Sequence, residues 1–156
     1  YLPDQSVVIT DDDADPSWNE LAAPLAEKYQ LPITSFVIGV DGPGPELSQY
    51  VRKRSHTYDM HSAGENGKGR MVNWPVSDVV NDLNKSAEIL GGVKEIVAYP
   101  YGHYNDDAKE AMREAGYELG RTVEQGYVTI GTDKLALPCV RMNYGAKTPQ
   151  LAAAIG

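Results

Sequence analysis

In Val7-Val8-Ile9-Thr10-Asp11-Asp12-Asp13, a short β-branched run ends in three consecutive carboxylates. A short, continuous apolar run is typical of a strand buried on both faces, so we predict a strand over residues 6–10 with Val7 and Ile9 nearly fully buried. Carboxylates side by side are unfavourable unless a cation neutralises them. The stretch therefore predicts a strand that carries a polar site at its carboxyl end.

Strands and helices alternate along the rest of the chain. Asp15 and Pro16 have the pattern of a helix cap followed by proline at the first helical position. We predict strands over 33–40, 52–55, 95–99, 117–122 and 138–142, and helices over 16–29, 46–51, 77–90, 105–116 and 148–155. Residues 62–73, rich in glycine and charge, are predicted to form a loop. This order predicts an α/β fold with a parallel sheet or barrel, in which Ile96 and Val97 are buried and their strand runs parallel to the first.

Size and charge narrow the classes of protein to consider. The 156 residues suit a single domain, residues 1–156, with a sizeable core. The net charge of −8 argues against a nucleic acid or an anionic membrane surface as partner. No apolar run approaches the ~20 residues that span a bilayer. Cys139 is the single cysteine, so an internal disulfide is excluded.

Two further segments follow predicted strands and carry chemistry. Two of the three histidines lie in the run from Ser55 to His61, and neutral imidazoles are the commonest protein ligands for metals. The segment Tyr99–Asn105 has the composition of a shaped loop. The carboxyl ends of parallel strands meet at one edge, where α/β folds place their active sites. Together with the acidic triplet, these segments predict one shared divalent-metal site.

The order of these segments resembles the polysaccharide deacetylases of the NodB homology family, also called carbohydrate esterase family 4. Thr10-Asp11-Asp12-Asp13-Ala14 occupies the place of the first family motif, Thr-Phe-Asp-Asp-Gly. Ser55-His56-Thr57 with His61 is similar to the second motif, and Tyr99-Pro100-Tyr101-Gly102 to the third. The spacing of the histidines and the form of the third motif look closest to the branch that deacetylates poly-β-1,6-N-acetylglucosamine.

The resemblance implies a fold and a reaction. The fold is a distorted, incomplete (β/α) barrel. The reaction is metal-dependent hydrolysis that removes acetyl groups from a polysaccharide containing N-acetylglucosamine, or from an O-acetylated polysaccharide. The family pattern assigns Asp13, His56 and His61 to one divalent ion, with zinc first and nickel, cobalt or iron as alternatives, and it makes Asp12 the general base. A polysaccharide or oligosaccharide partner and an extracellular or cell-surface location are implied with it.

The third motif implies the remaining site residues. The backbone N–H of Tyr101 would hold the developing oxyanion, which makes Tyr101 a catalytic as well as a substrate-binding residue. Pro100 and Gly102 would fix the shape of that loop, and Tyr104 would join them in binding substrate. His103 is the candidate general acid, since no later histidine exists.

The chain departs from the family pattern at several positions. Ala98 stands where many members carry an arginine, and Asp11 replaces the usual aromatic residue and is expected to be exposed. The late Leu-x-His and Asp-x-x-Asp-Trp segments are missing. The proton donor for the leaving amine therefore stays open between His103, solvent and a proton returned by Asp12.

Two other classes of function stay open on the sequence. The domain could bind polysaccharide without hydrolysing it, having lost the general acid. An acidic cluster at a strand end also suits a receiver domain that binds Mg²⁺ and accepts a phosphoryl group, although such domains need a further acidic acceptor and a lysine where this chain places His56 and Tyr101. A requirement for a transition metal would favour the deacetylase, and a requirement for Mg²⁺ alone would favour the receiver.

Overall fold

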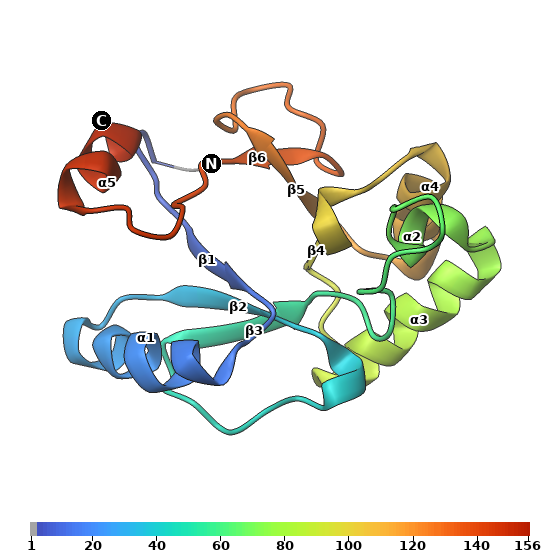
Figure 1. Ribbon diagram of the computed structural model, residues 1–156, viewed down its shortest axis with the longest axis horizontal. Coiled ribbons are helices and arrows are strands. Elements are labelled where there is room, and N and C mark those ends of the chain that lie inside the picture. Colours follow the sequence, from blue (N-terminus) through green and yellow to red (C-terminus); the bar gives the residue numbers. More distant parts are fainter. Residues whose placement is uncertain (1–2) are drawn as a thin grey trace.

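Six parallel strands form one sheet that is curled into an open half-barrel (Figure 1). The computed structural model describes residues 3–156. The strands follow the order of the chain: β1 (Ile9–Asp12), β2 (Ile33–Val37), β3 (Val51–Ser55), β4 (Ile96–Ala98), β5 (Leu119–Gln125) and β6 (Leu137–Cys139). Each neighbouring pair is parallel. The predicted α/β class, the incomplete barrel and the parallel relation of the first strand to β4 are confirmed.

The helices lie around the curled sheet. They are α1 (Pro16–Tyr29), α2 (Arg70–Asn73), α3 (Val76–Ile89), α4 (Asp106–Ala115) and α5 (Thr148–Ile155). Figure 1 shows α1 beside β2 and β3, and α3 and α4 together at the other end of the sheet. No helix in residues 3–156 is long and apolar enough to cross a membrane.

Local sequence explains where two of these helices begin. The Asp15 side chain accepts a hydrogen bond from Ser17 N at 2.8 Å, and Pro16 follows at the first helical position, as predicted. The Asn105 side chain accepts from Ala108 N at 2.8 Å and begins α4. Gly116 ends α4 with a left-handed φ of 82°, which a side chain would disfavour.

The hydrophobic core lies between α3, α4 and the middle of the sheet. Val79 and Leu83 on α3 pack with Met112 on α4 and Val97 on β4, and each of these side chains is almost completely buried. Burial of side chains of this size stabilises the fold by about 1.5–3 kcal/mol each. The core thus fixes α3 against the strands that end at the predicted site.

The first strand differs from its prediction. It begins at Ile9 and continues through Asp12, whereas Val7 is 56% and Ile9 43% exposed, so the prediction that both are buried is wrong. Strand β1 is an edge of the sheet and, among the described residues, pairs with β2 alone, which leaves its apolar side chains half covered. In the predicted partner strand, Val97 is fully buried but Ile96 only partly.

Other boundaries move by a few residues, and one helix is absent. The predicted strand 33–40 ends at Val37 and is followed by a 3-10 turn, Gly39–Asp41. No helix forms over 46–51: residues 46–48 have no regular secondary structure, 49–50 form a turn, and Val51 already belongs to β3. Residues 62–73 form the predicted loop except that its last turn is α2.

Candidate metal centre

Asp13, His56 and His61 meet at the carboxyl ends of β1 and β3. The Asp13 Oδ1 atom lies 3.0 Å from His56 Nε2 and 3.3 Å from His61 Nε2. One ligand atom of each residue lies within 4.8 Å of the others, a spacing that could hold a metal ion. The structure thus brings together the three residues that the sequence assigned to a metal.

Asp13 reaches this position through a tight turn. Asp13 and Ala14 both have positive φ angles, 73° and 51°, immediately after the last residue of β1. Aspartate tolerates this conformation better than most residues. The turn leaves the Asp13 side chain about half exposed, and its Oδ1 atom faces the two histidines.

His56 is held in one tautomer. Its Nδ1–H donates to the Ala98 carbonyl at 2.7 Å, because a carbonyl oxygen can only accept. Nε2 of the neutral ring therefore carries a lone pair, and it points at the Asp13 carboxylate. A ring oriented by a backbone carbonyl in this way is typical of metal-binding histidine.

These three residues fit a divalent cation. A lone pair and a carboxylate oxygen only 3.0 Å apart repel each other unless a proton or a metal lies between them. Ligands about 2.1 Å from an ion are about 3.0–3.4 Å from each other at right-angled to tetrahedral geometry, which matches the separations from Asp13. Where a proton takes the place of a metal, the hydrogen bond that His56 Nε2–H donates to Asp13, together with the positive charges of the His56 and His61 rings, holds the pKa of Asp13 below its usual value.

Asp12 is the last residue of β1 and pairs with Arg121 of β5. Arg121 Nη2 donates to Asp12 Oδ1, and the Asp12 side chain stays 35% exposed. The guanidinium also donates to the Thr122 carbonyl at 3.1 Å and lies 5.1 Å from the centre of the Phe36 ring. A charged side chain that is only 10% exposed and is fixed by several contacts holds the carboxylate in one orientation.

Arg121 is a site residue that none of the sequence motifs predicted. The available signal was Ala98, since the family's usual arginine is missing there, together with an arginine inside a predicted strand. In the structure Ala98 and Arg121 are register partners on β4 and β5. The positive charge at the site is therefore the Arg121 guanidinium, which comes from the neighbouring strand β5.

Asp11 is partly buried, so the expectation that it is exposed is wrong. Strand β1 runs on through Asp12, and successive side chains point to opposite faces, which places Asp11 on the face away from Arg121. Its Oδ2 atom is buried and has no hydrogen-bond partner in the described chain. Burial, reinforced by Asp12 and Asp13, raises the pKa of Asp11 to about 6.

The third predicted segment forms the rim beside the two histidines. Pro100–Gly102 is a 3-10 turn in which Pro100 is buried and Tyr101 has φ 57°. The Tyr101 ring lies 4.6 Å from the His61 ring, its hydroxyl donates to the His61 carbonyl at 3.4 Å, and 44% of the residue is exposed. Gly102 has φ 72°, and a Cβ there would overlap the Val123 side chain, so this position requires glycine.

His103 and Tyr104 contact residues outside the cluster of Asp13, His56 and His61. His103 Nδ1 accepts a hydrogen bond from Gly69 N–H at 3.1 Å, which places the proton of the neutral ring on Nε2 and ties the 62–69 loop to the third segment. The Tyr104 ring stacks on Tyr99 at 5.3 Å, and its hydroxyl donates to Glu124 at 2.8 Å, which raises the pKa of Tyr104. Both side chains are thus already held by protein partners.

A family model described as polysaccharide deacetylase matches residues 1–120. The chain belongs to this polysaccharide deacetylase family. Its catalogued relatives include poly-β-1,6-N-acetyl-D-glucosamine N-deacetylases of Staphylococcus aureus strain MRSA252, at 31% identity over 88% of this chain, and of Staphylococcus epidermidis, at 28% over 93%. The aligned parts are 54% and 57% of those relatives, so the chain spans about half of their length.

Solved deacetylase structures share the fold. The Streptococcus pyogenes deacetylase PplD, in complex with acetate, superposes with a TM-score of 0.80 at 22% identity, covering 100% of this chain and 73% of that one. IcaB from Ammonifex degensii gives 0.77 at 25% identity, covering 99% and 75%. The family resemblance read from three short motifs is confirmed. Family membership also removes the receiver domain from the alternatives.

Proposed function

We propose that this chain is a metal-dependent deacetylase of polysaccharides that contain N-acetylglucosamine, with poly-β-1,6-N-acetylglucosamine as the substrate to test first. The observation that carries the proposal is the meeting of Asp13, His56 and His61 beside Asp12, which is the one carboxylate of the site fixed by an arginine. The names of the staphylococcal relatives support the choice of polymer.

The proposed reaction needs both an electrophile and a base, because an acetamide carbonyl is unreactive and neutral water is a weak nucleophile. A divalent ion held by Asp13, His56 and His61 would polarise the carbonyl and acidify the attacking water. Asp12 accepts the proton of that water in this scheme. Its Oδ1 is occupied by Arg121, and no protein donor within residues 3–156 occupies Oδ2, which leaves this oxygen for the water.

The donor set favours a transition metal. Two imidazoles and one carboxylate on one side of an ion leave open positions and suit Zn²⁺, Fe²⁺, Co²⁺ and Ni²⁺, whereas Mg²⁺ prefers a shell of oxygen atoms. We propose Zn²⁺ as the first ion to test, with nickel, cobalt and iron as alternatives.

Tyr101 and its neighbours supply the wall against which the acetyl group would lie. The backbone N–H of Tyr101 is proposed to donate to the oxyanion, in a turn whose unusual conformation is fixed by Pro100 and Gly102. The exposed Tyr101 ring offers a flat apolar face beside His61, which suits the face of a sugar ring. Tyr104 stays a proposed substrate contact at the outer end of this segment.

His103 is the proposed donor of the proton to the leaving amine. Its Nε2–H is free of the bond that Nδ1 makes with Gly69, so the ring can act through that atom without releasing the loop. A proton returned by Asp12 or taken from solvent is the competing route. An extracellular or cell-surface location follows from the proposed polymer and belongs to the same proposal.

The test is acetate release from three kinds of substrate: β-1,6-linked N-acetylglucosamine oligomers, chitin oligomers and acetylated xylan. Each is assayed with the Zn²⁺-loaded protein and with protein treated with a chelator. We expect release from the β-1,6-linked oligomers only in the presence of metal. Metal-dependent release from xylan alone would move the activity to O-acetyl groups. Specific binding of oligomers without any release would favour the non-catalytic alternative.

A further inference from the structure

Residues 57–60, between the two candidate histidine ligands, have no regular secondary structure, yet hydrogen bonds to several other segments hold their backbone. The carbonyls of Thr57 and Tyr58 accept hydrogen bonds from Gly39 N at 2.9 Å and Val40 N at 2.8 Å. The Asp59 carbonyl accepts from Arg70 Nη1 at 2.8 Å. These contacts hold the acceptors of the segment, but its N–H groups need partners of their own.

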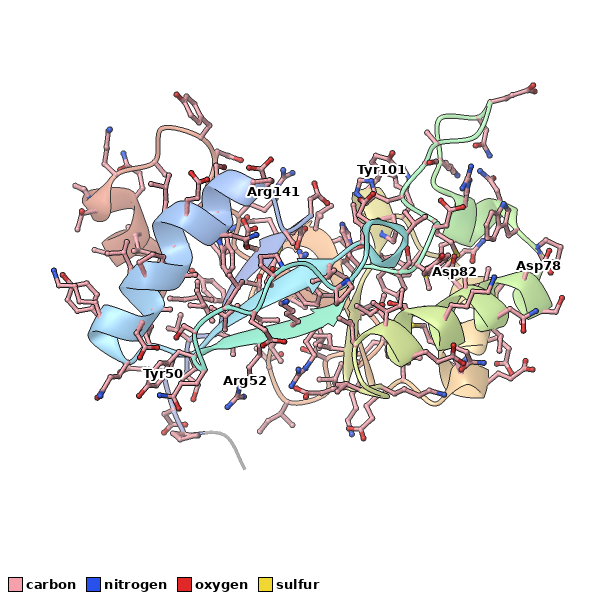
Figure 2. All side chains as sticks on the ribbon, turned by 90° about the horizontal axis from the view of Figure 1, so that it is seen from below. Tyr50, Arg52, Asp78, Asp82, Tyr101 and Arg141 are labelled. Atoms are coloured by element: carbon pink, nitrogen blue, oxygen red, sulfur yellow. The ribbon has the colours of Figure 1, made fainter. Side chains whose placement is uncertain are left out.

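One side chain on α3 supplies partners for two successive N–H groups. Asp82 Oδ1 accepts from Tyr58 N at 2.7 Å, and Asp82 Oδ2 accepts from Asp59 N at 2.8 Å. Figure 2 labels Asp82 on this helix and Asp78 one turn earlier. The carboxylate therefore bridges from a core helix to the middle of the segment that separates His56 from His61.

The burial of the Asp82 carboxylate is destabilising, which argues against a purely structural role for this residue. It is 4% exposed and lies on the helix face that also carries Val79, Leu83 and Ala87. No lysine or arginine in residues 3–156 makes a salt bridge with it, and burial raises its pKa. A buried carboxylate without a salt-bridge partner is destabilising unless hydrogen bonds compensate it. Its two backbone partners are that compensation.

The segment that Asp82 holds is in a strained conformation. Thr57 is completely buried and has φ 68°, which is unfavourable for a β-branched residue. Strain of about 1–3 kcal/mol persists only where the surroundings enforce it. Thr57 N donates to Ser55 Oγ at 3.0 Å, and Met60 N donates to Thr57 Oγ1 at 3.3 Å. The resulting turn lets His56 and His61, five positions apart, face the same Asp13 oxygen.

We propose that Asp82 is a positioning residue for the metal centre: by binding the N–H groups of Tyr58 and Asp59 it sets the separation and direction of His56 and His61. The inference rests on the proposed metal site and adds a residue that none of the three sequence motifs contains. Loss of this contact lets the segment relax at Thr57 and moves His61 relative to His56.

The test compares Asp82→Asn with Asp78→Asn, because Asp78 lies on the same helix but is exposed. Asparagine keeps the size of the side chain, but its NH₂ group faces one of the two N–H donors and cannot accept from it. We expect Asp82→Asn to weaken Zn²⁺ and Co²⁺ binding by about 10- to 100-fold in titration calorimetry, the usual scale for residues that orient ligands. The visible absorption of the Co²⁺-loaded protein should also change. Asp78→Asn should match wild type in both measurements.

Three results separate this inference from its alternatives. Asp82→Glu retains the charge and both acceptor oxygens one methylene further out, so its affinity should lie between those of wild type and Asp82→Asn. If Asp82→Asn does not fold, Asp82→Glu becomes the deciding variant, and a wild-type Kd with an unchanged Co²⁺ spectrum would overturn the proposal. If Asp82→Asn folds, a wild-type Kd and an unchanged Co²⁺ spectrum in that variant would overturn the proposal for Asp82 but leave the proposed metal site intact. Wild-type protein that binds neither ion would remove the proposed function and this inference together.

Discussion

Arg121 Nη2 donates a hydrogen bond to Asp12 Oδ1 and joins β5 to β1, although the two residues are 109 positions apart in the chain. The guanidinium is held by the Thr122 carbonyl and by the Phe36 ring, so it is a rigid partner. This contact distinguishes Asp12 from its neighbours: Asp13 faces the histidines, and the buried oxygen of Asp11 has no partner in the described residues.

Arg121→Met should lower kcat for deacetylation by about 10- to 100-fold, because the base loses its fixed orientation. Methionine retains an apolar stem against Phe36, and no ligand of the proposed metal is touched, so the Kd for Zn²⁺ should not change. Steady-state kinetics and titration calorimetry check the two expectations. Arg52→Met, at an exposed position of β3, is the matched control and should leave both quantities at wild-type values. Equal kcat in Arg121→Met and wild type would show that the ion pair has no part in the reaction.

His56→Ala should abolish stoichiometric binding of Zn²⁺, because it removes the ligand whose tautomer is fixed by Ala98. His103→Asn is the control, since the asparagine Oδ1 can replace the Nδ1 acceptor that holds Gly69. It should bind Zn²⁺ like wild type. Titration calorimetry measures the number of Zn²⁺ ions bound by each variant. One bound ion in His56→Ala would contradict the proposed ligand set.

The same His103→Asn variant tests the proton donor. It keeps the loop contact but removes the proton on Nε2, so kcat should fall by at least about 10-fold if His103 protonates the leaving amine. Activity equal to wild type would assign that proton to Asp12 or to solvent.

Gly102→Ala should destabilise the protein and lower kcat, because the new Cβ overlaps Val123 and displaces the Tyr101 turn. Gly67→Ala is matched in backbone conformation, with the same φ of 72°, but a Cβ there meets no atom within 4 Å. The free-energy cost of placing alanine at a positive φ, about 1 kcal/mol or more in each variant, therefore cancels in the comparison. Thermal unfolding and kcat measured on both variants isolate the effect on the turn. Equal losses in the two variants would remove the argument for a shaped loop at Gly102.

Asp11 predicts a pH dependence of stability in the metal-free protein. Its pKa of about 6 in the folded state exceeds the ordinary value of 3.8, so the folded state binds a proton more tightly than the unfolded state. The stabilisation this provides is complete below pH 3.8 and is lost as the pH rises through about 6. Asp11→Asn should therefore gain stability relative to wild type at pH 8, by at most about 3 kcal/mol, and gain less at pH 5. Denaturant unfolding with a chelator at the two pH values measures this difference, and an equal difference at both would contradict the assignment.

The candidate site was more predictable from sequence than the packing around it. Asp13 and His56 each follow a strand directly, and parallel strands bring such positions to one edge whatever the exact strand boundaries are. His61 lies six residues beyond β3, but its place in the same short segment as His56 made it a candidate. Arg121 and Asp82 act from a distant strand and from a helix, so their contacts depend on the register of β5 and the rotation of α3, which no local pattern encodes. The burial of Val7 and Ile9 was predicted wrongly for a related reason. A β-branched run looks the same in a central strand and in an edge strand, and only the order of the sheet separates the two.

The most direct test of the central claim is acetate release from a β-1,6-linked N-acetylglucosamine oligomer by Zn²⁺-loaded wild type and Asp12→Asn. Asparagine preserves the shape of Asp12 and can still accept from Arg121, but it cannot take a proton from water. The expected result is that both proteins bind Zn²⁺ with the same Kd, that wild type releases acetate, and that Asp12→Asn releases it at least about 10²-fold more slowly. Equal rates for the two proteins, or no release by metal-loaded wild type, would contradict it.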